Sequence, residues 1–354
     1  MPDTDFVKGK AGPQGMTGDQ WISGTHGREI LVDIQGLHTH FHTPEGVVHA
    51  LAGVDLQLWK GRTLGLVGES GCGKTVLALS ILRLIPEPPG KIVKGRIFFE
   101  GTDLLSLDRD GIRRIRGNKI SMIFQEPMTS LNPVFTIGSQ IEEVILLHQS
   151  HLASTRKQAR AMAVEMLDMV GIPYPARRID DYPHQLSGGM CQRIMIAMAL
   201  ACRPSLMIAD EPTTALDVTT QAQILLLMSE LKEETHTSIL LVTHDLGVVA
   251  QSCEDVAVMY TGNVVEHAAV EDIFSQPLHP YTKGLMKSIP TVEARKWGER
   301  LHAIPGNVPT FRSIPRGCTF HNRCEEVMDI CRKEPPPVFC PFRDHSVRCW
   351  RYAN

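Results

Sequence analysis

The sequence has no surplus of charge of one sign: its 354 residues include 36 Lys and Arg against 39 Asp and Glu, a formal net charge of −3. Affinity for nucleic acid depends on a surplus of basic residues, so this balance argues against a nucleic-acid partner. No apolar run reaches the ~18 residues that cross a bilayer; the best candidate, residues 194–202, stops at Arg203 and Pro204. The first residues also lack the basic and then apolar order of a secretory signal. We therefore expect a soluble, cytoplasmic chain.

Regular apolar patterns are missing from residues 1–27, which are rich in Gly, Thr, Asp and Gln and are expected to form a flexible tail. From residue 28 short apolar runs alternate with helical stretches, which predicts an α/β domain with a mainly parallel sheet. After Tyr281 the composition shifts to Pro, Arg and Cys, which indicates a second, smaller domain over residues 282–354. Expected strands are residues 63–67, 96–100, 119–124, 205–209 and 238–242, and expected helices include residues 74–85 and 155–170.

A glycine-rich loop of the form G-x-x-x-x-G-K-T follows the first of these strands and opens a helix. Its glycines allow a tight turn in which backbone N–H groups and the helix N-terminus face phosphate groups. Lys74 is expected to reach the β- and γ-phosphates of ATP, and the Thr75 hydroxyl is expected to ligate Mg²⁺. Cys72 stands where the backbone makes the contact, so we expect no redox role for it. The loop residues expected to bind the nucleotide are Gly68, Glu69, Ser70, Gly71, Cys72, Gly73, Lys74 and Thr75.

Two further segments point to the same chemistry. An apolar strand ends in Asp210, which suits the carboxylate that holds Mg²⁺, and in Glu211, which could polarise an attacking water. Ser187, Gly188 and Gly189 open a helical stretch and form a candidate second anion site, although alone they are also consistent with a simple N-cap. One chain cannot easily direct both phosphate-binding segments at one phosphate group. Two copies packed head to tail can, so we expect a dimer with ATP between its subunits.

With these motifs in this order, the sequence resembles an ABC-transporter ATP-binding subunit over residues 28–281. The resemblance implies a P-loop NTPase core, with a mainly parallel sheet, an antiparallel β subdomain and a helical subdomain at about residues 130–195. It implies an active ATPase in which Glu211 is the catalytic glutamate. Gln125 resembles the glutamine that senses Mg²⁺ and connects to the membrane partner, and His244 resembles the switch histidine near the γ-phosphate.

The resemblance extends to three further positions. Residues 187–190 resemble the family's signature segment, with Met190 where Gln is usual, and residues 215–217 resemble the D-loop of the dimer interface. Phe41 is the candidate for the aromatic side chain that stacks on adenine, and a core phenylalanine is the alternative interpretation.

Beyond His279, Pro280 and Tyr281, the chain resembles the ATP-binding subunits of oligopeptide, dipeptide and nickel importers, which carry an extension that begins with these three residues. The extension is expected to be a small Cys-rich domain. Its cysteines lack the C-x2-C pairs usual for zinc ribbons. Their irregular spacing suits a [4Fe–4S] cluster, with zinc or reduced thiols as alternatives. The expected ligands are Cys318, Cys324, Cys331 and Cys349, and Cys340 is left as a spare.

The resemblance implies a subunit that hydrolyses ATP to power the import of di- or oligopeptides from the cytoplasmic face of the inner membrane. Its expected partners are a second, homologous ATP-binding subunit in a heterodimer, two transmembrane permease subunits, and a periplasmic or extracellular substrate-binding protein. An importer of nickel or another small solute is the first alternative. A soluble ABC ATPase of DNA repair or translation, or an ATP-binding regulator without turnover, would lack the membrane partners or the hydrolysis.

Overall fold

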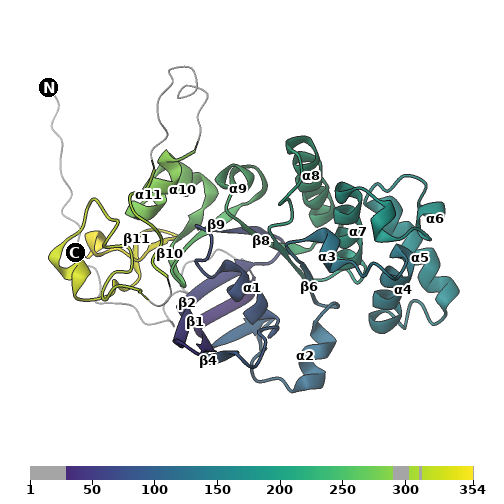
Figure 1. The fold of residues 1–354 in the computed structure, drawn as a ribbon, viewed down its shortest axis with the longest axis horizontal. Coiled ribbons are helices and arrows are strands. Elements are labelled where there is room, and N and C mark those ends of the chain that lie inside the picture. The colour runs from purple at the N-terminus through teal and green to yellow at the C-terminus, as the bar shows by residue number, and fades with distance from the viewer. Residues whose placement is uncertain (1–28, 290–302, 311–312, 354) are drawn as a thin grey trace.

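The computed structural model describes residues 29–289, 303–310 and 313–353. The tail expected for residues 1–27 lies outside this part of the chain. The molecule is elongated, and Figure 1 shows a group of helices (α3 to α7) at one end and the C-terminal strands at the other. The larger of two β-sheets runs from the C-terminal strands toward the helices, so the candidate motifs fall near the middle of the molecule.

The larger sheet has the strand order β11-β12-β10-β9-β3-β8-β7-β6. Neighbouring strands are parallel from β9 to β6, and β10, β12 and β11 are added antiparallel at one edge. The central strands are buried on both faces, as their continuous apolar runs predict. The strands are β3 (Thr63–Val67), β6 (Ile120–Ile123), β7 (Leu206–Asp210), β8 (Ser238–Thr243), β9 (Asp255–Tyr260), β10 (Asn263–Ala269), β11 (Phe339–Phe342) and β12 (His345–Val347).

The parallel direction of β3, β6, β7 and β8 decides where the motifs lie. The carboxyl ends of neighbouring parallel strands meet at one edge of a sheet, which is where ligands bind in open α/β folds. The phosphate loop follows β3, Gln125 follows β6, Glu211 follows β7 and His244 follows β8. Segments more than a hundred residues apart in the sequence therefore share one edge.

The smaller sheet is antiparallel, with the order β2-β1-β4-β5. It corresponds to the antiparallel β subdomain that the family resemblance implies. Its two long strands form a hairpin whose limits the apolar pattern did not predict, because polar residues and four histidines interrupt the alternation. It supplies Leu37, Leu51 and Val54 to the core under the phosphate loop. The strands are β1 (Ile30–Thr43), β2 (Gly46–Trp59), β4 (Gly90–Phe99) and β5 (Thr102–Asp103).

Helices α3 to α7 form a group whose buried core continues onto α8 and the adjoining strands of the larger sheet. Ile137, Ile141 and Ile145 lie four residues apart on α4 and are fully buried in that core. Thr155 and Gln158 form a capping box that fixes the start of α5. The helices of the group are α3 (Pro127–Ser130), α4 (Ile137–His148), α5 (Arg156–Met169), α6 (Pro175–Arg178), the 3-10 helix η2 (Pro183–Gln185) and α7 (Gly188–Leu200).

Some element limits differ from expectation. The helix after the phosphate loop, α1, ends at Ile81 rather than at residue 85, because Arg83 has a left-handed backbone with φ +52°. The strand expected at residues 96–100 begins earlier, at Gly90, since its first half pairs with β1. The remaining helices are α1 (Lys74–Ile81), α2 (Arg109–Ile115), α8 (Val218–Thr235), α9 (Leu246–Ser252), α10 (Val270–Ser275), α11 (Pro280–Lys287) and the 3-10 helices η3 (Asp329–Arg332) and η4 (Trp350–Tyr352).

The C-terminal residues are built onto the ATP-binding core. Strand β12 pairs with β10, so β11 and β12 extend the larger sheet. Phe320 is buried against Tyr260 and Tyr281, with ring centroids 5.3 and 5.4 Å away. The separate Cys-rich domain expected from the sequence is therefore not confirmed, and residue 281 lies within α11. Among the described helices, none is both long and apolar enough to cross a membrane.

Candidate functional site

The phosphate loop is held in place by close backbone approach. Gly68 has φ +154°, and a Cβ at this position would lie 2.2 Å from the carbonyl oxygen of Met259 on β9. Gly73 has φ +106°, and its Cβ would lie 2.8 Å from the carbonyl oxygen of Ala50 on β2. Both glycines are therefore required by the contacts around the loop as well as by its turn.

Lys74 is the first residue of α1 and is buried. Its ammonium donates to the carbonyl oxygens of Gly68, at 2.8 Å, and Glu69, at 3.3 Å. The positive charge therefore lies inside the loop that precedes the helix N-terminus. This is the arrangement that attracts the β- and γ-phosphates of a nucleotide.

Thr75 and Asp210 come together from a helix and a strand. The Thr75 hydroxyl lies at the start of α1 and donates to Asp210 Oδ1 at 3.3 Å, at the carboxyl end of β7. Burial raises the pKa of Asp210, and the Thr75 hydrogen bond and the charge of Lys74 oppose that rise. A hydroxyl beside a desolvated carboxylate suits a hard cation such as Mg²⁺, which would also compensate the burial of the negative charge.

Glu211 is the point where the predicted catalytic residues meet. Gln125 donates its amide N–H to Glu211 Oε2 at 3.1 Å, and His244 Nδ1 lies 3.2 Å from Oε1. The Thr214 hydroxyl also donates to Oε2, at 2.9 Å. The backbone of Glu211 has φ +48°, and its N–H donates to the carbonyl oxygen of Val242 on β8, which fixes this uncommon conformation.

The Glu211 carboxylate is kept ionised by these neighbours. Burial acts to raise the pKa, but the hydrogen bonds from His244 and Thr214 outweigh it and bring the pKa below its usual value. An ionised carboxylate beside the phosphate loop can accept a proton from water or orient it for attack. Thr214 is a contact that the sequence analysis missed, and its only sequence signal is its place three residues after Glu211.

Ser187 caps its own helix. Its hydroxyl accepts the backbone N–H of Met190 at 3.3 Å at the start of α7. Figure 1 shows α7 in the helical group, apart from α1 and the phosphate loop. Among the described hydrogen bonds, none joins Ser187 to that loop, so the chain does not bring its two phosphate-binding segments together by itself. Asp217 likewise caps α8, accepting the N–H of Thr220 at 3.0 Å.

Phe41 lies at the end of β1 and is half-buried. It pairs with Val48 on β2 and with Gly90 on β4, and its ring lies 2.9 Å from where a Cβ of Gly90 would be. Its role toward adenine therefore remains a proposal.

The C-terminal cysteines lie around one small cavity. It is bordered by Cys318, Cys324, Cys331 and Cys349, together with residues of α11 and η4. Burial raises the pKa of three of these thiols to about 11, and all four are free of disulfides. Cys340 is exposed on β11 and is not among the residues that border the cavity.

The metal expected at these cysteines is not confirmed. Within the described part of the chain, no group of three or more His, Cys, Asp or Glu residues is placed to hold a metal ion. The described residues therefore do not support an iron–sulfur cluster or a zinc ion at these cysteines.

Comparison with known proteins agrees with the geometry of the nucleotide site. Residues 51–214 match the family model of the ABC transporter, and residues 265–331 match that of the oligopeptide/dipeptide transporter C-terminal region. A probable peptide ABC transporter ATP-binding protein, y4tR of Sinorhizobium fredii, is 51% identical over 91% of this chain and 95% of its own length. The chain belongs to the ABC transporter ATP-binding subunits.

Other relatives and solved structures agree with this assignment. The oligopeptide transport ATP-binding protein AppD of Bacillus subtilis is 50% identical over 92% of this chain and 97% of its own length. The dipeptide transport ATP-binding protein DppD of the same organism is 49% identical over 91% and 95%. Among solved structures, a dimeric ATP-binding cassette in a post-hydrolysis state with ADP and Pi is 30% identical, with a TM-score of 0.60 over 68% of this chain and 98% of that one.

Membership of the ABC transporter family has consequences for the activity of the chain and for its assembly. The chain is an ATPase that binds ATP with Mg²⁺. Subunits of this family form dimers and work with permeases in the membrane, so peripheral association with a membrane is consistent with the absence of a spanning helix among the described residues.

Proposed function

We propose that this chain is the ATP-hydrolysing subunit of an importer of di- or oligopeptides. The observation that carries the proposal is the match of residues 265–331 to the C-terminal region of oligopeptide/dipeptide transporters. Relatives named for peptide, oligopeptide and dipeptide transport that cover nine-tenths of the chain support it. A nickel or other small-solute importer is not favoured by these names.

For hydrolysis, each residue at the shared sheet edge has a distinct role. The phosphate loop and Lys74 bind and neutralise the β- and γ-phosphates. Thr75 and Asp210 would hold Mg²⁺, which would neutralise the negative charge of the phosphate oxygens. Glu211 orients the attacking water, and His244 orients Glu211 and would contact the γ-phosphate of a bound nucleotide. Gln125 joins this site to the loop that begins the helical group. Positioning of this kind accounts for most of the catalysis of phosphoryl transfer.

A second subunit completes the binding site for ATP. Because Ser187 caps α7 and does not reach the phosphate loop of its own chain, we assign its anion site, with Gly188 and Gly189, to a nucleotide bound by the neighbouring subunit. The exposed caps at Ser187 and Asp217 support this arrangement. The second subunit is proposed to be a homologue, which makes a heterodimer.

An exposed apolar surface around the Gln125 loop supports a docking site for the permeases. Phe124, Val134 and Phe135 are 44, 71 and 54% exposed, which is unusual for apolar side chains of this size. They flank the segment that runs from the catalytic glutamine into α4, so a permease seated there could sense the state of the nucleotide. A substrate-binding protein outside the membrane would select the peptide.

We propose that the cavity of the four cysteines holds a [4Fe–4S] cluster, with zinc as the alternative. The cavity supports this proposal because four thiols from separated segments face the same space. A cluster needs its four ligands farther apart than a single ion does, so thiols that do not suit an ion can still suit a cluster. Anaerobic purification with iron and sulfide analysis tests it. About four irons per chain are expected, whereas stoichiometric zinc or metal-free thiols would contradict it.

The peptide assignment is tested by purifying the whole complex with its permeases and placing it in proteoliposomes with its binding protein. We expect ATP-dependent uptake of radiolabelled di- and oligopeptides, and no uptake with a Glu211→Gln subunit. Uptake of a nickel chelate but of no peptide would overturn the peptide assignment and leave the ATPase assignment intact. Recovery of the chain without any permease would contradict its place in a transporter.

A further inference from the structure

The phosphate loop contains a carboxylate that hydrolysis does not use. Glu69 follows Gly68 directly, and its backbone carbonyl accepts from Lys74. A negative side chain in a loop that binds a polyphosphate opposes that binding unless a positive charge compensates it. The compensating groups come from the C-terminal segment, more than two hundred residues away.

Arg323 forms a two-point ion pair with this carboxylate. Its Nη1 lies 2.7 Å from Glu69 Oε2 and its Nη2 lies 3.1 Å from Oε1. Its Nε donates to the carbonyl oxygen of Pro305 at 2.9 Å, which fixes the orientation of the guanidinium. Arg323 is only 7% exposed and packs over the rings of Tyr260 and Phe320. A planar guanidinium held in this way is preorganised for one carboxylate.

Tyr281 fixes the backbone of the same residue. Its hydroxyl oxygen accepts the Glu69 N–H at 2.9 Å, and the Tyr281 side chain is fully buried. The neighbouring His279 caps α11 by accepting the Tyr281 N–H at 3.0 Å, so the ring position depends on the start of that helix. The C-terminal segment therefore holds both the N–H and the carboxylate of one phosphate-loop residue.

We propose that Arg323 and Tyr281 are positioning residues of the ATP site, which neutralise and orient Glu69 so that the phosphate loop can accept the nucleotide. This role goes beyond the peptide importer proposed above, since it concerns how the C-terminal segment sets the affinity for ATP. Arg323 also directly precedes Cys324, which borders the thiol cavity.

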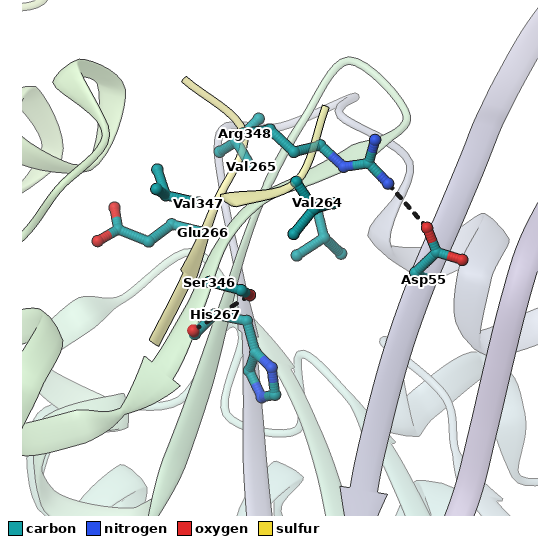
Figure 2. Close-up of a pocket in the computed structure, with 9 residues that line it drawn as sticks. Asp55, Val264, Val265, Glu266, His267, Ser346, Val347 and Arg348 are labelled. Carbon is teal, nitrogen blue, oxygen red and sulfur yellow. Dashed lines mark hydrogen bonds and ion pairs between the residues drawn. The ribbon is translucent and has the colours of Figure 1, made fainter. Parts of the chain in front are cut away.

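A second link between the C-terminal segment and the core provides a matched control. Arg348 Nη2 lies 2.8 Å from Asp55 Oδ2 on β2 (Figure 2). It also lies 3.3 Å from the Gly53 carbonyl oxygen. Like Arg323, it joins the last part of the chain to the ATP-binding core by an ion pair. None of its described contacts involves the phosphate loop. Arg348→Gln therefore removes a comparable tether without uncovering a charge beside the nucleotide.

The test measures the equilibrium affinity of the full-length chain for a fluorescent ATP analogue. For Arg323→Gln we expect a loss of affinity of about tenfold, inside the range of about 5- to 150-fold that coupled sites show. Turnover at saturating ATP should stay within about threefold of wild type, because the catalytic group around Glu211 is untouched. Added salt should reduce the defect, since the uncovered charge of Glu69 is then screened.

The decisive variant is the double substitution Glu69→Gln with Arg323→Gln. Removing the carboxylate removes the repulsion, so the double variant should recover most of the lost affinity, while Arg348→Gln should bind ATP as wild type does. Tyr281→Phe should weaken binding without any rescue by Glu69→Gln, because the lost partner is a backbone N–H. Wild-type affinity in a folded Arg323→Gln, or a double variant as weak as the single one, would overturn the proposal.

Discussion

Replacing Glu211 by Gln tests the assignment of the catalytic centre most directly. The change preserves the size of the side chain and an oxygen that can still accept from Gln125 and Thr214. It removes the negative charge, and with it the charged partner 3.2 Å from His244 Nδ1. The phosphate loop and the pair of Thr75 and Asp210 are unchanged, so ATP and Mg²⁺ should still bind.

The expected size of the effect follows from the role of the carboxylate. A positioned general base contributes about 10²- to 10⁴-fold to the rate, which at about 1.36 kcal/mol per tenfold is roughly 2.7–5.4 kcal/mol of barrier. We therefore expect turnover to fall at least about a hundredfold while the affinity for ATP changes little. The variant should also accumulate as a dimer with ATP held between its subunits.

Single-turnover release of phosphate and equilibrium binding of a labelled nucleotide separate these two effects. Dimerisation is followed by sedimentation in the presence of ATP. Glu233→Gln on the exposed face of α8 is the control, because it makes the same chemical change away from the site. Near-normal turnover in Glu211→Gln, or a loss of ATP binding as large as the loss of turnover, would refute the role given to this carboxylate.

Three further outcomes follow from described contacts. Gly68→Ala should abolish ATP binding, because the new Cβ would lie 2.2 Å from a carbonyl oxygen. Gly101→Ala is the control, since at φ +76° with no neighbour within 4 Å it introduces only backbone strain. The nucleotide affinity of both variants checks this. Burial lowers the pKa of His279 to about 4. Between pH 6.5 and about pH 4 the imidazole is therefore protonated in the unfolded chain but not in the folded one, so the free energy of unfolding should fall as the pH is lowered through this range. His279→Asn should flatten this part of a urea-denaturation series, and an unchanged slope would contradict it. Burial acts to raise the pKa of Glu266, but hydrogen bonds from His345 and two backbone N–H groups bring it below its usual value. Glu266→Gln should therefore lower the free energy of unfolding by about 3 kcal/mol near neutral pH. The loss should shrink progressively below pH 4.5, where the carboxylate of the wild type becomes protonated.

The sequence predicted the parts of the site that depend on local pattern. Strand β3 occupies the residues expected for it, and the strand before Asp210 and Glu211 is shifted by one residue. Each is a short apolar run followed by a turn motif, so burial on both faces can be inferred from composition. The family resemblance also named Gln125 and His244 as candidate site residues, and the structure places both beside Glu211 because all three follow parallel strands.

Contacts between distant segments could not be inferred in this way. Arg323 and Glu69 are separated by 254 residues, and neither residue type signals its partner. The C-terminal segment was expected to be a separate domain because its composition differs, but pairing of β12 with β10 places it on the sheet. Such pairing depends on the edge that the rest of the sheet leaves free, which no local pattern of the C-terminal segment describes.

The position of β3 between β8 and β9 has a consequence for the synthesis of the protein. The phosphate loop leaves the ribosome early, but β3 pairs through Val67 with Thr243 and Val258, which are made about 180 residues later. Until then the apolar β3 has no sheet to join, and nascent chains with such unpaired strands are prone to aggregate. The partners of Glu69 arrive later still. A nascent chain therefore becomes able to hold ATP only after β8 and β9 have been made, and it gains its full affinity only after Arg323 has followed. Products truncated before β8 should need chaperones rather than nucleotide to stay soluble.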